Sequence, residues 1–237
     1  MKNLISYKYN SPIREGIFLS RPNRFIAEIM IDGKVEIAHV MNTGRLPELL
    51  VAGTKCWVQE FDNPLRKTKF SLITVEYKNN YVNIDSQVPN KIIYDAFVES
   101  KISGWENPDK VEKEVKVGSS RLDFKVTKGS EILYVEVKGV NLVFDDKTAS
   151  FPDAITTRGT KHLLELIQLK EKGYNSMVLF LAQRGDLINF RPHVEMDPIF
   201  SHAFYQAIEK GVEARVYKSI VGQDFITLDG RVDILGI

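Results

Sequence analysis

The segment from 112 to 139, EKEVKVGSSRLDFKVTKGSEILYVEVKG, contains three consecutive strand patterns and predicts the sheet around which the chain folds. Apolar and polar side chains alternate in RLDFKV and again in ILYVEVK, which is the period of a strand with one apolar and one polar face. The turn between them, residues 127–130, is short and contains Gly129, so the two strands are predicted to form an antiparallel hairpin. Asp123 and Glu136 then converge on one face, with Lys138 two residues further along.

These three side chains suit phosphodiester hydrolysis. Mg²⁺ is typically held by one or two carboxylates together with waters and substrate phosphate oxygens. Asp123 and Glu136 supply two carboxylates, and a bound Mg²⁺ or Mn²⁺ would polarise a phosphodiester and activate water. Lys138 would orient that water or stabilise the developing charge. On the hairpin alone a second interpretation stays open, because cross-strand charge pairs are also common on a solvent-facing hairpin.

Composition limits the classes of protein to consider. At 237 residues the chain can form one large domain or two small ones, and a net charge of +1 means that any basic surface must be local. The single cysteine, Cys56, excludes an intrachain disulfide and a cysteine zinc cluster. No apolar run is long enough to cross a membrane, and MKNLISYKYN lacks the apolar region of a signal peptide. We therefore expect a cytoplasmic protein without a membrane partner.

Residues 1–86 are predicted to form an OB-like β-barrel that binds nucleic acid. Short strand patterns follow one another here, separated by turns such as Asp32-Gly33, and a small barrel is one fold for such a series. Cations and an aromatic ring on the loops would contact a nucleic-acid strand by charge and stacking. These candidates are Arg24, Phe25, Arg45, Arg66 and Lys67. Taken alone, each of them is better explained as a solvated loop residue, and only together do they suggest a nucleic-acid surface.

From residue 87 the pattern changes to alternating helices and strands, which predicts an α/β domain over 87–237. Asn90 is predicted to cap a first helix on which Asp95 and Glu99 share one face. A second helix is expected to begin after Thr156 or Thr157 and to end at Gly173. It carries Arg158 and Lys161, which would bind a phosphate backbone or be a solvated face, while His162 is expected to be structural or to contact phosphate.

The order of elements resembles the PD-(D/E)xK nuclease core, in which a helix acid, a strand Asp and Glu-x-Lys bind Mg²⁺. More narrowly, the chain resembles the sugar fermentation stimulation protein A family over nearly its whole length. The motifs that carry this resemblance include RFIAEI, Asn42-Thr43-Gly44, NPLRK, PNKIIYDA, SRLDF, YVEVKGV and FPDAITTRGTKHLLEL. The resemblance implies an OB-like N-terminal domain joined to a nuclease-like mixed sheet flanked by helices, with DNA binding and a regulatory role in sugar utilisation.

The resemblance also implies a site. The helix acid of the family matches Asp95, with Glu99 as its substitute, and the strand residues match Asp123, Glu136 and Lys138. Asp95, Asp123 and Glu136 are thus the expected metal ligands. Further positions that match the family around the same face are Glu114, Asp153, Arg158, Lys161 and Gln183.

We therefore hypothesise a nucleic-acid-binding protein, for DNA more than RNA, with a Mg²⁺-dependent phosphodiesterase site. One alternative is a non-catalytic DNA-binding transcriptional regulator on a vestigial nuclease scaffold, whose binding would not need Mg²⁺. Another is a carbohydrate-binding module, for which the sequence shows no obvious pair of aromatic platforms, because Trp57 and Trp105 are far apart in the chain.

Overall fold

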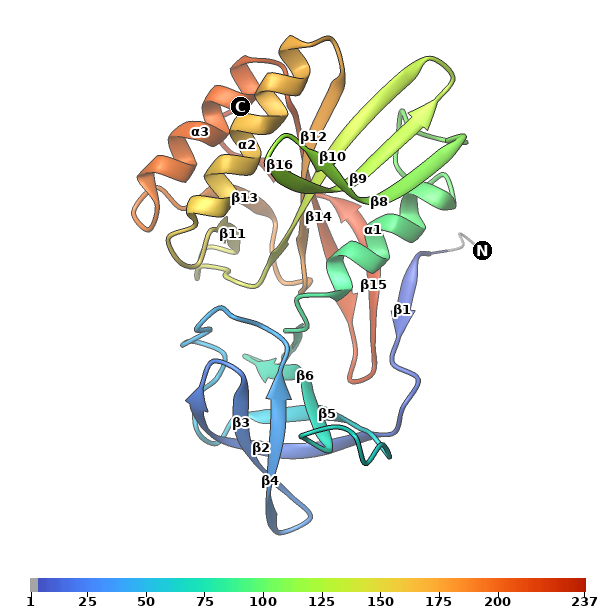
Figure 1. Ribbon diagram of the computed structural model, residues 1–237. Helices are drawn as coiled ribbons and strands as arrows, with labels where there is room; N and C mark the ends of the chain where they lie inside the picture. The colour runs from blue at the N-terminus through green and yellow to red at the C-terminus, as the bar shows by residue number, and fades with distance from the viewer. Residues whose placement is uncertain (1–3) are drawn as a thin grey trace.

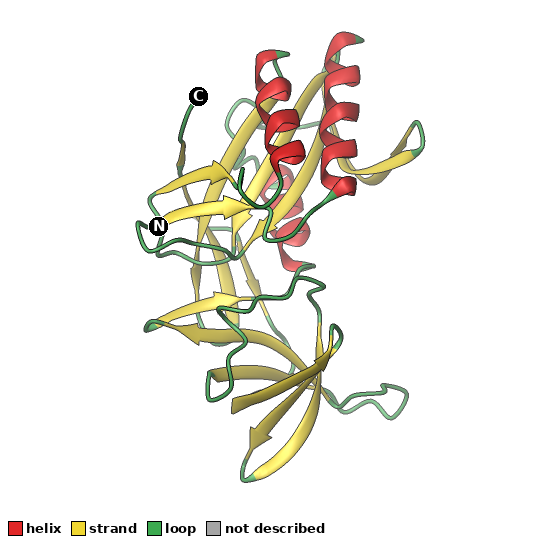
Figure 2. Cartoon of the chain, turned by 90° about the vertical axis from the view of Figure 1, so that its left-hand side faces the viewer, coloured by secondary structure: helices red, strands yellow, loops and turns green. Residues whose placement is uncertain are grey.

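The computed structural model describes residues 4–237, which form a small barrel joined to a larger sheet with helices on both faces (Figure 1). Figure 2 shows the same two parts from the side, with all the helices packed against the larger sheet. This arrangement confirms the mixed α/β class, with an N-terminal barrel and a C-terminal sheet flanked by helices. No helix within residues 4–237 is long and apolar enough to cross a membrane.

The barrel is built from six strands. They are β2 (Ile13–Asn23), β3 (Ile26–Ile31), β4 (Lys34–Val40), β5 (Lys55–Glu60), β6 (Phe70–Tyr77) and β7 (Asn80–Asn83), in the order β4-β3-β2-β5-β6-β7. An additional parallel pairing of β4 with β6 closes the sheet on itself. The turn between β3 and β4 has positive φ at both Asp32 and Gly33, as a tight hairpin turn requires. Buried aliphatic side chains fill the interior, and the predicted OB-like barrel is confirmed.

The larger sheet has seven strands. They are β1 (Ser6–Lys8), β8 (Lys110–Val117), β9 (Ser120–Lys128), β10 (Glu131–Val140), β12 (Asn175–Ala182), β14 (Glu213–Val221) and β15 (Phe225–Arg231), in the order β1-β15-β14-β12-β10-β9-β8. The central strands β10, β12 and β14 are parallel and the outer pairs are antiparallel. Because β1 pairs with β15, residues 6–8 lie in the larger sheet and not in the barrel to which the sequence assigned them.

Three helices cover this sheet in the described part of the chain: α1 (Val88–Val98), α2 (Thr157–Glu171) and α3 (Pro198–Glu209). α2 and α3 pack together on one face and α1 lies on the other (Figure 1). A small parallel sheet of β11 (Thr148–Phe151), β13 (Asn189–Pro192) and β16 (Asp233–Ile234) lies beside α3. Each face of the large sheet buries its own apolar core against its helices, so the strands between them are fixed from both sides.

The start of α1 differs from the sequence prediction. The helix begins at Val88, two residues before Asn90, with Pro89 in the first turn where a missing N–H costs nothing. Asn90 is therefore not the N-cap but a residue of the first turn, and its side chain donates a hydrogen bond to Asp123. The predicted α2 is confirmed, since Thr156 accepts a hydrogen bond from the backbone N–H of Gly159 and caps the helix.

Polar contacts lock the barrel to the larger domain. The Gln183 side chain donates to Asn83 Oδ1 at 2.7 Å and to the carbonyl of Asp85 at 2.8 Å. The fully buried guanidinium of Arg184 lies 5.0 Å from the ring of Tyr77 and pairs with Asp186 through two hydrogen bonds of 2.7 and 2.6 Å. These contacts hold the end of β12 against the barrel.

Candidate active site

The β9–β10 hairpin brings Asp123 and Glu136 together. Its ladder runs from Lys128 paired with Glu131 to Phe124 paired with Val135, so Asp123 and Glu136 come next in the same register. Beyond Phe124 the strands separate, and the Asp123 carboxylate accepts the backbone N–H of Val137 at 2.7 Å. The predicted register of Asp123 with Glu136 is therefore present, but the two side chains contact different helices, Asp123 with Asn90 of α1 and Glu136 with His162 of α2.

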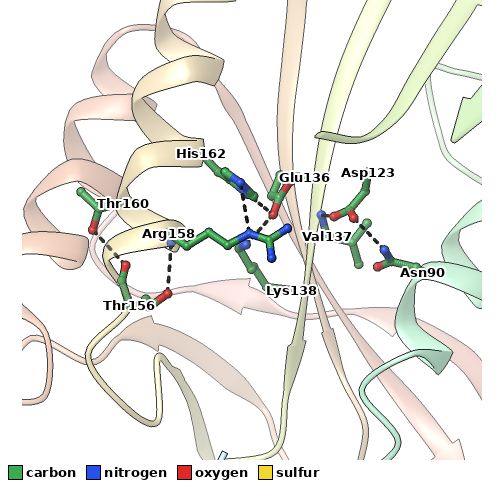
Figure 3. Close-up of polar contacts among 10 residues, drawn as sticks. Asn90, Asp123, Glu136, Val137, Lys138, Thr156, Arg158, Thr160 and His162 are labelled. Carbon is green, nitrogen blue, oxygen red and sulfur yellow. Dashed lines mark hydrogen bonds and ion pairs between the residues drawn. The ribbon is translucent and has the colours of Figure 1, made fainter. Parts of the chain in front are cut away.

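Asp123 is a half-buried carboxylate with two donors. Asn90, from the first turn of α1, donates to Oδ1 at 2.7 Å, and Val137 donates to Oδ2 (Figure 3). Burial, together with the negative charge of Glu136, raises the pKa of Asp123 to about 6. The hydrogen bond from Val137 and the charge of Lys138 oppose that rise without cancelling it. A second positive charge at this position would favour the ionised form.

Glu136 is buried, and its two oxygens have different surroundings. Oε1 accepts from Lys138 Nζ at 2.5 Å and also contacts His162 Nδ1 (Figure 3). Burial alone would raise the pKa of Glu136, but the hydrogen bond from His162 and the charge of Lys138 hold it below its usual value. Oε2 is buried and has no hydrogen-bond partner. An ionised carboxylate with one free oxygen therefore lies next to Asp123.

The oxygen atoms of this pair fit a hard divalent cation. Two neighbouring carboxylates, one with a raised pKa and one with an unpartnered oxygen, offer the hard oxygen ligands that Mg²⁺ or Mn²⁺ prefers, although Lys138 already compensates part of their charge. Within residues 4–237 no group of three or more His, Cys, Asp or Glu side chains converges as a metal site. Further ligands would have to be backbone carbonyls, waters or substrate oxygens, which is the usual way in which Mg²⁺ is bound.

The structure does not place Asp95 at this site. Asp95 and Glu99 are both exposed on α1, whereas the residue of α1 that contacts Asp123 is Asn90. Five residues of α-helix turn the side-chain direction by about 140°, so the faces that present Asn90 and Asp95 differ. The assignment of Asp95 as a metal ligand, with Glu99 as its substitute, is not supported by this geometry. An uncharged amide lies where a helix acid was expected.

The first turns of α2 approach the carboxylate pair from the other side. Arg158 Nε is 3.5 Å from His162 Nε2, and His162 in turn contacts Glu136. Lys161 is exposed on the same part of the helix. Sequence reasoning expected a structural or phosphate-contacting His162 but missed its contact with Glu136, although its spacing of four residues from Arg158 placed both on one helix face.

The other positions matched by resemblance lie apart from the pair. Glu114 is exposed and pairs with Arg121 at 3.0 Å. Gln183 belongs to the contact between barrel and sheet. Asp153 lines a separate cavity of about 170 Å³ at that contact, where a Cβ on Gly44 would be 2.6 Å from Asp153 Oδ2.

The five barrel candidates fall into two groups. Arg24, Phe25 and Arg45 are exposed near the end of β2, where Arg21 donates to the carbonyls of Arg24 and Arg45 and so ties the two loops together. Arg66 and Lys67 follow β5, whose last residues pair with the start of β2, so they lie at the opposite end of that strand. The Arg66 guanidinium is also 3.7 Å from the ring of Phe61 and donates to Ser71 at 2.8 Å. These candidates thus do not form one surface.

Comparison with known proteins gives the family. Residues 87–225 match the family model described as "Sugar fermentation stimulation protein RE domain", and residues 19–84 match "SfsA N-terminal OB domain". The chain belongs to the sugar fermentation stimulation protein family. It is 43% identical over 224 residues to a homologue from Clostridium tetani, covering 94% of this chain and 97% of that one. It is 47% identical over 214 residues to a homologue from Methanobrevibacter smithii, covering 86% of this chain and 89% of that one.

A solved structure of the same family has the same fold. It is described as "The structure of Pyrococcus Furiosus SfsA in complex with Ca2+", and it matches with a TM-score of 0.87 and 28% identity over 96% of this chain and 99% of that one. The barrel from residue 19 onward thus lies within the range matched by the family's OB domain, and the carboxylate pair lies within the range of its RE domain.

Proposed function

We propose that this protein is a Mg²⁺- or Mn²⁺-dependent phosphodiesterase that acts on nucleic acid, on DNA more than on RNA. The observation that supports the proposal is the pair of Asp123 and Glu136: Glu136 has a buried carboxylate oxygen without a partner, and its charge helps to raise the pKa of Asp123. A purely structural pair of this kind would leave one polar atom unsatisfied, which is unfavourable. A divalent cation would satisfy that atom and remove the repulsion between the two groups.

Asp123 and Glu136 would hold the cation, which when bound would polarise the phosphodiester and lower the pKa of a water. The solved Pyrococcus furiosus relative is described as a complex with Ca²⁺, and a site for one hard cation in the family supports one here. Asn90 and the N–H of Val137 fix the orientation of the Asp123 carboxylate. Lys138 donates a hydrogen bond to Glu136, and from this position its ammonium group would stabilise the charge that develops on the phosphoryl oxygens.

His162 would act on Glu136 and not on the phosphate. Its Nδ1 contacts Glu136 Oε1, so it holds that carboxylate with the other oxygen free. Arg158, next to His162 Nε2, is exposed and can reach an anionic substrate. In the barrel, Arg24, Phe25 and Arg45 would hold a more distant part of the strand by charge and stacking.

The test is cleavage of end-labelled single-stranded and double-stranded DNA and RNA in Mg²⁺, Mn²⁺ or EDTA. The wild type is expected to cut in either metal and not in EDTA, whereas Glu136→Gln and Lys138→Gln are expected to be inactive. Lys172→Gln, an exposed lysine at the far end of α2, is the matched control and should cut like the wild type. If no substrate is cut and DNA is bound equally well in EDTA, the protein is a DNA-binding regulator on a nuclease scaffold.

A further inference from the structure

A cationic cleft lies next to the carboxylate pair and is not part of it. The cleft has a volume of about 510 Å³ and runs between the β8–β9 turn and the first turns of α2. Lys116 and Arg121 line one wall, and Arg158 and Lys161 line the other. Asp123, Glu136 and Lys138 do not line it, and none of the described residues that do is acidic.

Each wall places like charges where they repel. Lys116 and Arg121 are paired directly across the β8–β9 ladder, and like charges in that position destabilise a sheet. Arg158 and Lys161 are three residues apart on α2, where like charges destabilise a helix. The charge of Arg121 is partly compensated by its ion pair with Glu114, which lies outside the cleft. Four cations facing one another across a cavity are explained if an anion occupies it.

Hydroxyl groups of Ser119, Ser120 and Thr157 complete the lining. A volume of this size accommodates a group as large as a nucleotide. His162 is shared, because it lines the cleft and also contacts Glu136. An anion in the cleft would therefore be next to a phosphate bound at the carboxylate pair, and the two sites would be neighbours along one nucleic-acid strand.

We propose that this cleft is a second phosphate site, which binds the phosphate neighbouring the one that is cleaved. The proposal rests on the proposed function for the identity of the strand, but binding in the cleft needs neither metal nor cleavage. The phosphate would be either an internal diester of the strand or a terminal monoester. Both have the anionic oxygens that lysine and arginine side chains bind.

The test is the affinity of a fluorescein-labelled single-stranded oligonucleotide, measured in EDTA over a series of salt concentrations. The double variant Lys116→Gln/Lys161→Gln removes one cation from each wall, and both residues are exposed. Lys172→Gln/Lys210→Gln removes the same charge from the exposed C-terminal ends of α2 and α3 and is the control. Each lost contact with a single strand should reduce the slope of log affinity against log salt by about 0.7, so the cleft variant should lose about 1.4.

Oligonucleotides with and without terminal phosphates identify which phosphate binds. An equal loss for both indicates an internal diester, and a loss only for the phosphorylated strands indicates a terminal monoester. A cleft variant with the slope and affinity of the wild type on every strand would overturn the proposal. Because binding is measured without metal, failure of cleavage in Mg²⁺ would refute the phosphodiesterase and leave this result unaffected. The cleft variant should also unfold at no lower urea concentration than the wild type, because like-charge repulsion is relieved.

Discussion

The carboxylate pair makes a testable claim about stability, since a site built to hold a cation should be unfavourable without one. The perturbation is Asp123→Asn, which removes the negative charge and preserves the shape of the side chain. The raised pKa of Asp123 means that the folded protein binds a proton here more tightly than the unfolded chain does. Ionised Asp123 should therefore destabilise the wild type at alkaline pH.

The magnitude follows from the pKa. The ordinary value is 3.8 and the folded value is about 6. A difference of about two units corresponds to about 3 kcal/mol of destabilisation at pH 8. The Asn side chain has one acceptor in place of two, so it loses one of the hydrogen bonds from Asn90 and Val137, at about 1 kcal/mol. Asp123→Asn should therefore be about 2 kcal/mol more stable than the wild type at pH 8.

The sign changes with pH. Protonated Asp123 contributes stability that is fully present below the unfolded pKa of 3.8 and is lost as the pH rises through the folded value of about 6. Near pH 4 the wild type carries a neutral Asp123 and keeps its hydrogen bonds, so there the variant should be about 1 kcal/mol less stable. The assay is urea unfolding of both proteins in EDTA at several values between pH 4 and pH 8. A difference between the two midpoints that does not depend on pH would show that ionised Asp123 does not destabilise the folded protein.

Three further predictions concern the surroundings of the site. Gly139→Ala should lower the free energy of unfolding by about 1–3 kcal/mol, because the added Cβ would lie 2.7 Å from Gln183 Oε1. Gly230→Ala is the control, since its Cβ would meet no atom within 4 Å and should have little effect. Equal urea midpoints for the two variants would contradict this prediction. Arg184→Met leaves the Asp186 carboxylate without its buried partner and should lower the free energy of unfolding by about 3 kcal/mol in the same assay. A loss below about 1 kcal/mol would show that this ion pair contributes little to stability. Asn90→Asp adds a third carboxylate beside Asp123 and Glu136, so Mg²⁺ should raise the melting temperature of this variant more than that of the wild type. An equal rise in both proteins would argue against a metal ion at this site.

Local patterns in the sequence predicted most of the fold. The alternation in RLDFKV and ILYVEVK fixed both the strands and the register that brings Asp123 and Glu136 together, because a strand has a period of two and the turn between them is short. Helix α2 was likewise predicted with its cap, because Thr156 is followed by an amphipathic run. The pairing of β1 with β15 could not be predicted in this way, since it joins residues about 220 positions apart.

The site was less predictable where it depends on packing between elements. Resemblance to a nuclease core pointed to Asp95, whereas the rotation of α1 on the sheet presents Asn90 to Asp123. The packing of the apolar side of α1 against the sheet decided this, because it leaves Asp95 exposed. The helix also starts two residues earlier than the capping preference of asparagine suggested, with a proline in its first turn. The contact of His162 with Glu136 joins a helix to a strand, and no local pattern encodes it.

In the proposed mechanism, the pair of Asp123 and Glu136 acts through a divalent cation that contacts the phosphate being cut. The measurement that tests it most directly is the cleavage rate of an oligonucleotide with sulfur in place of one non-bridging oxygen at the scissile phosphate, in Mg²⁺ and in Mn²⁺. Because Mn²⁺ accepts sulfur better than the harder Mg²⁺ does, cleavage should fall in Mg²⁺ and recover in Mn²⁺ for the wild type. Cleavage that is slowed equally in both metals, or that continues in EDTA or in Glu136→Gln, would contradict the account.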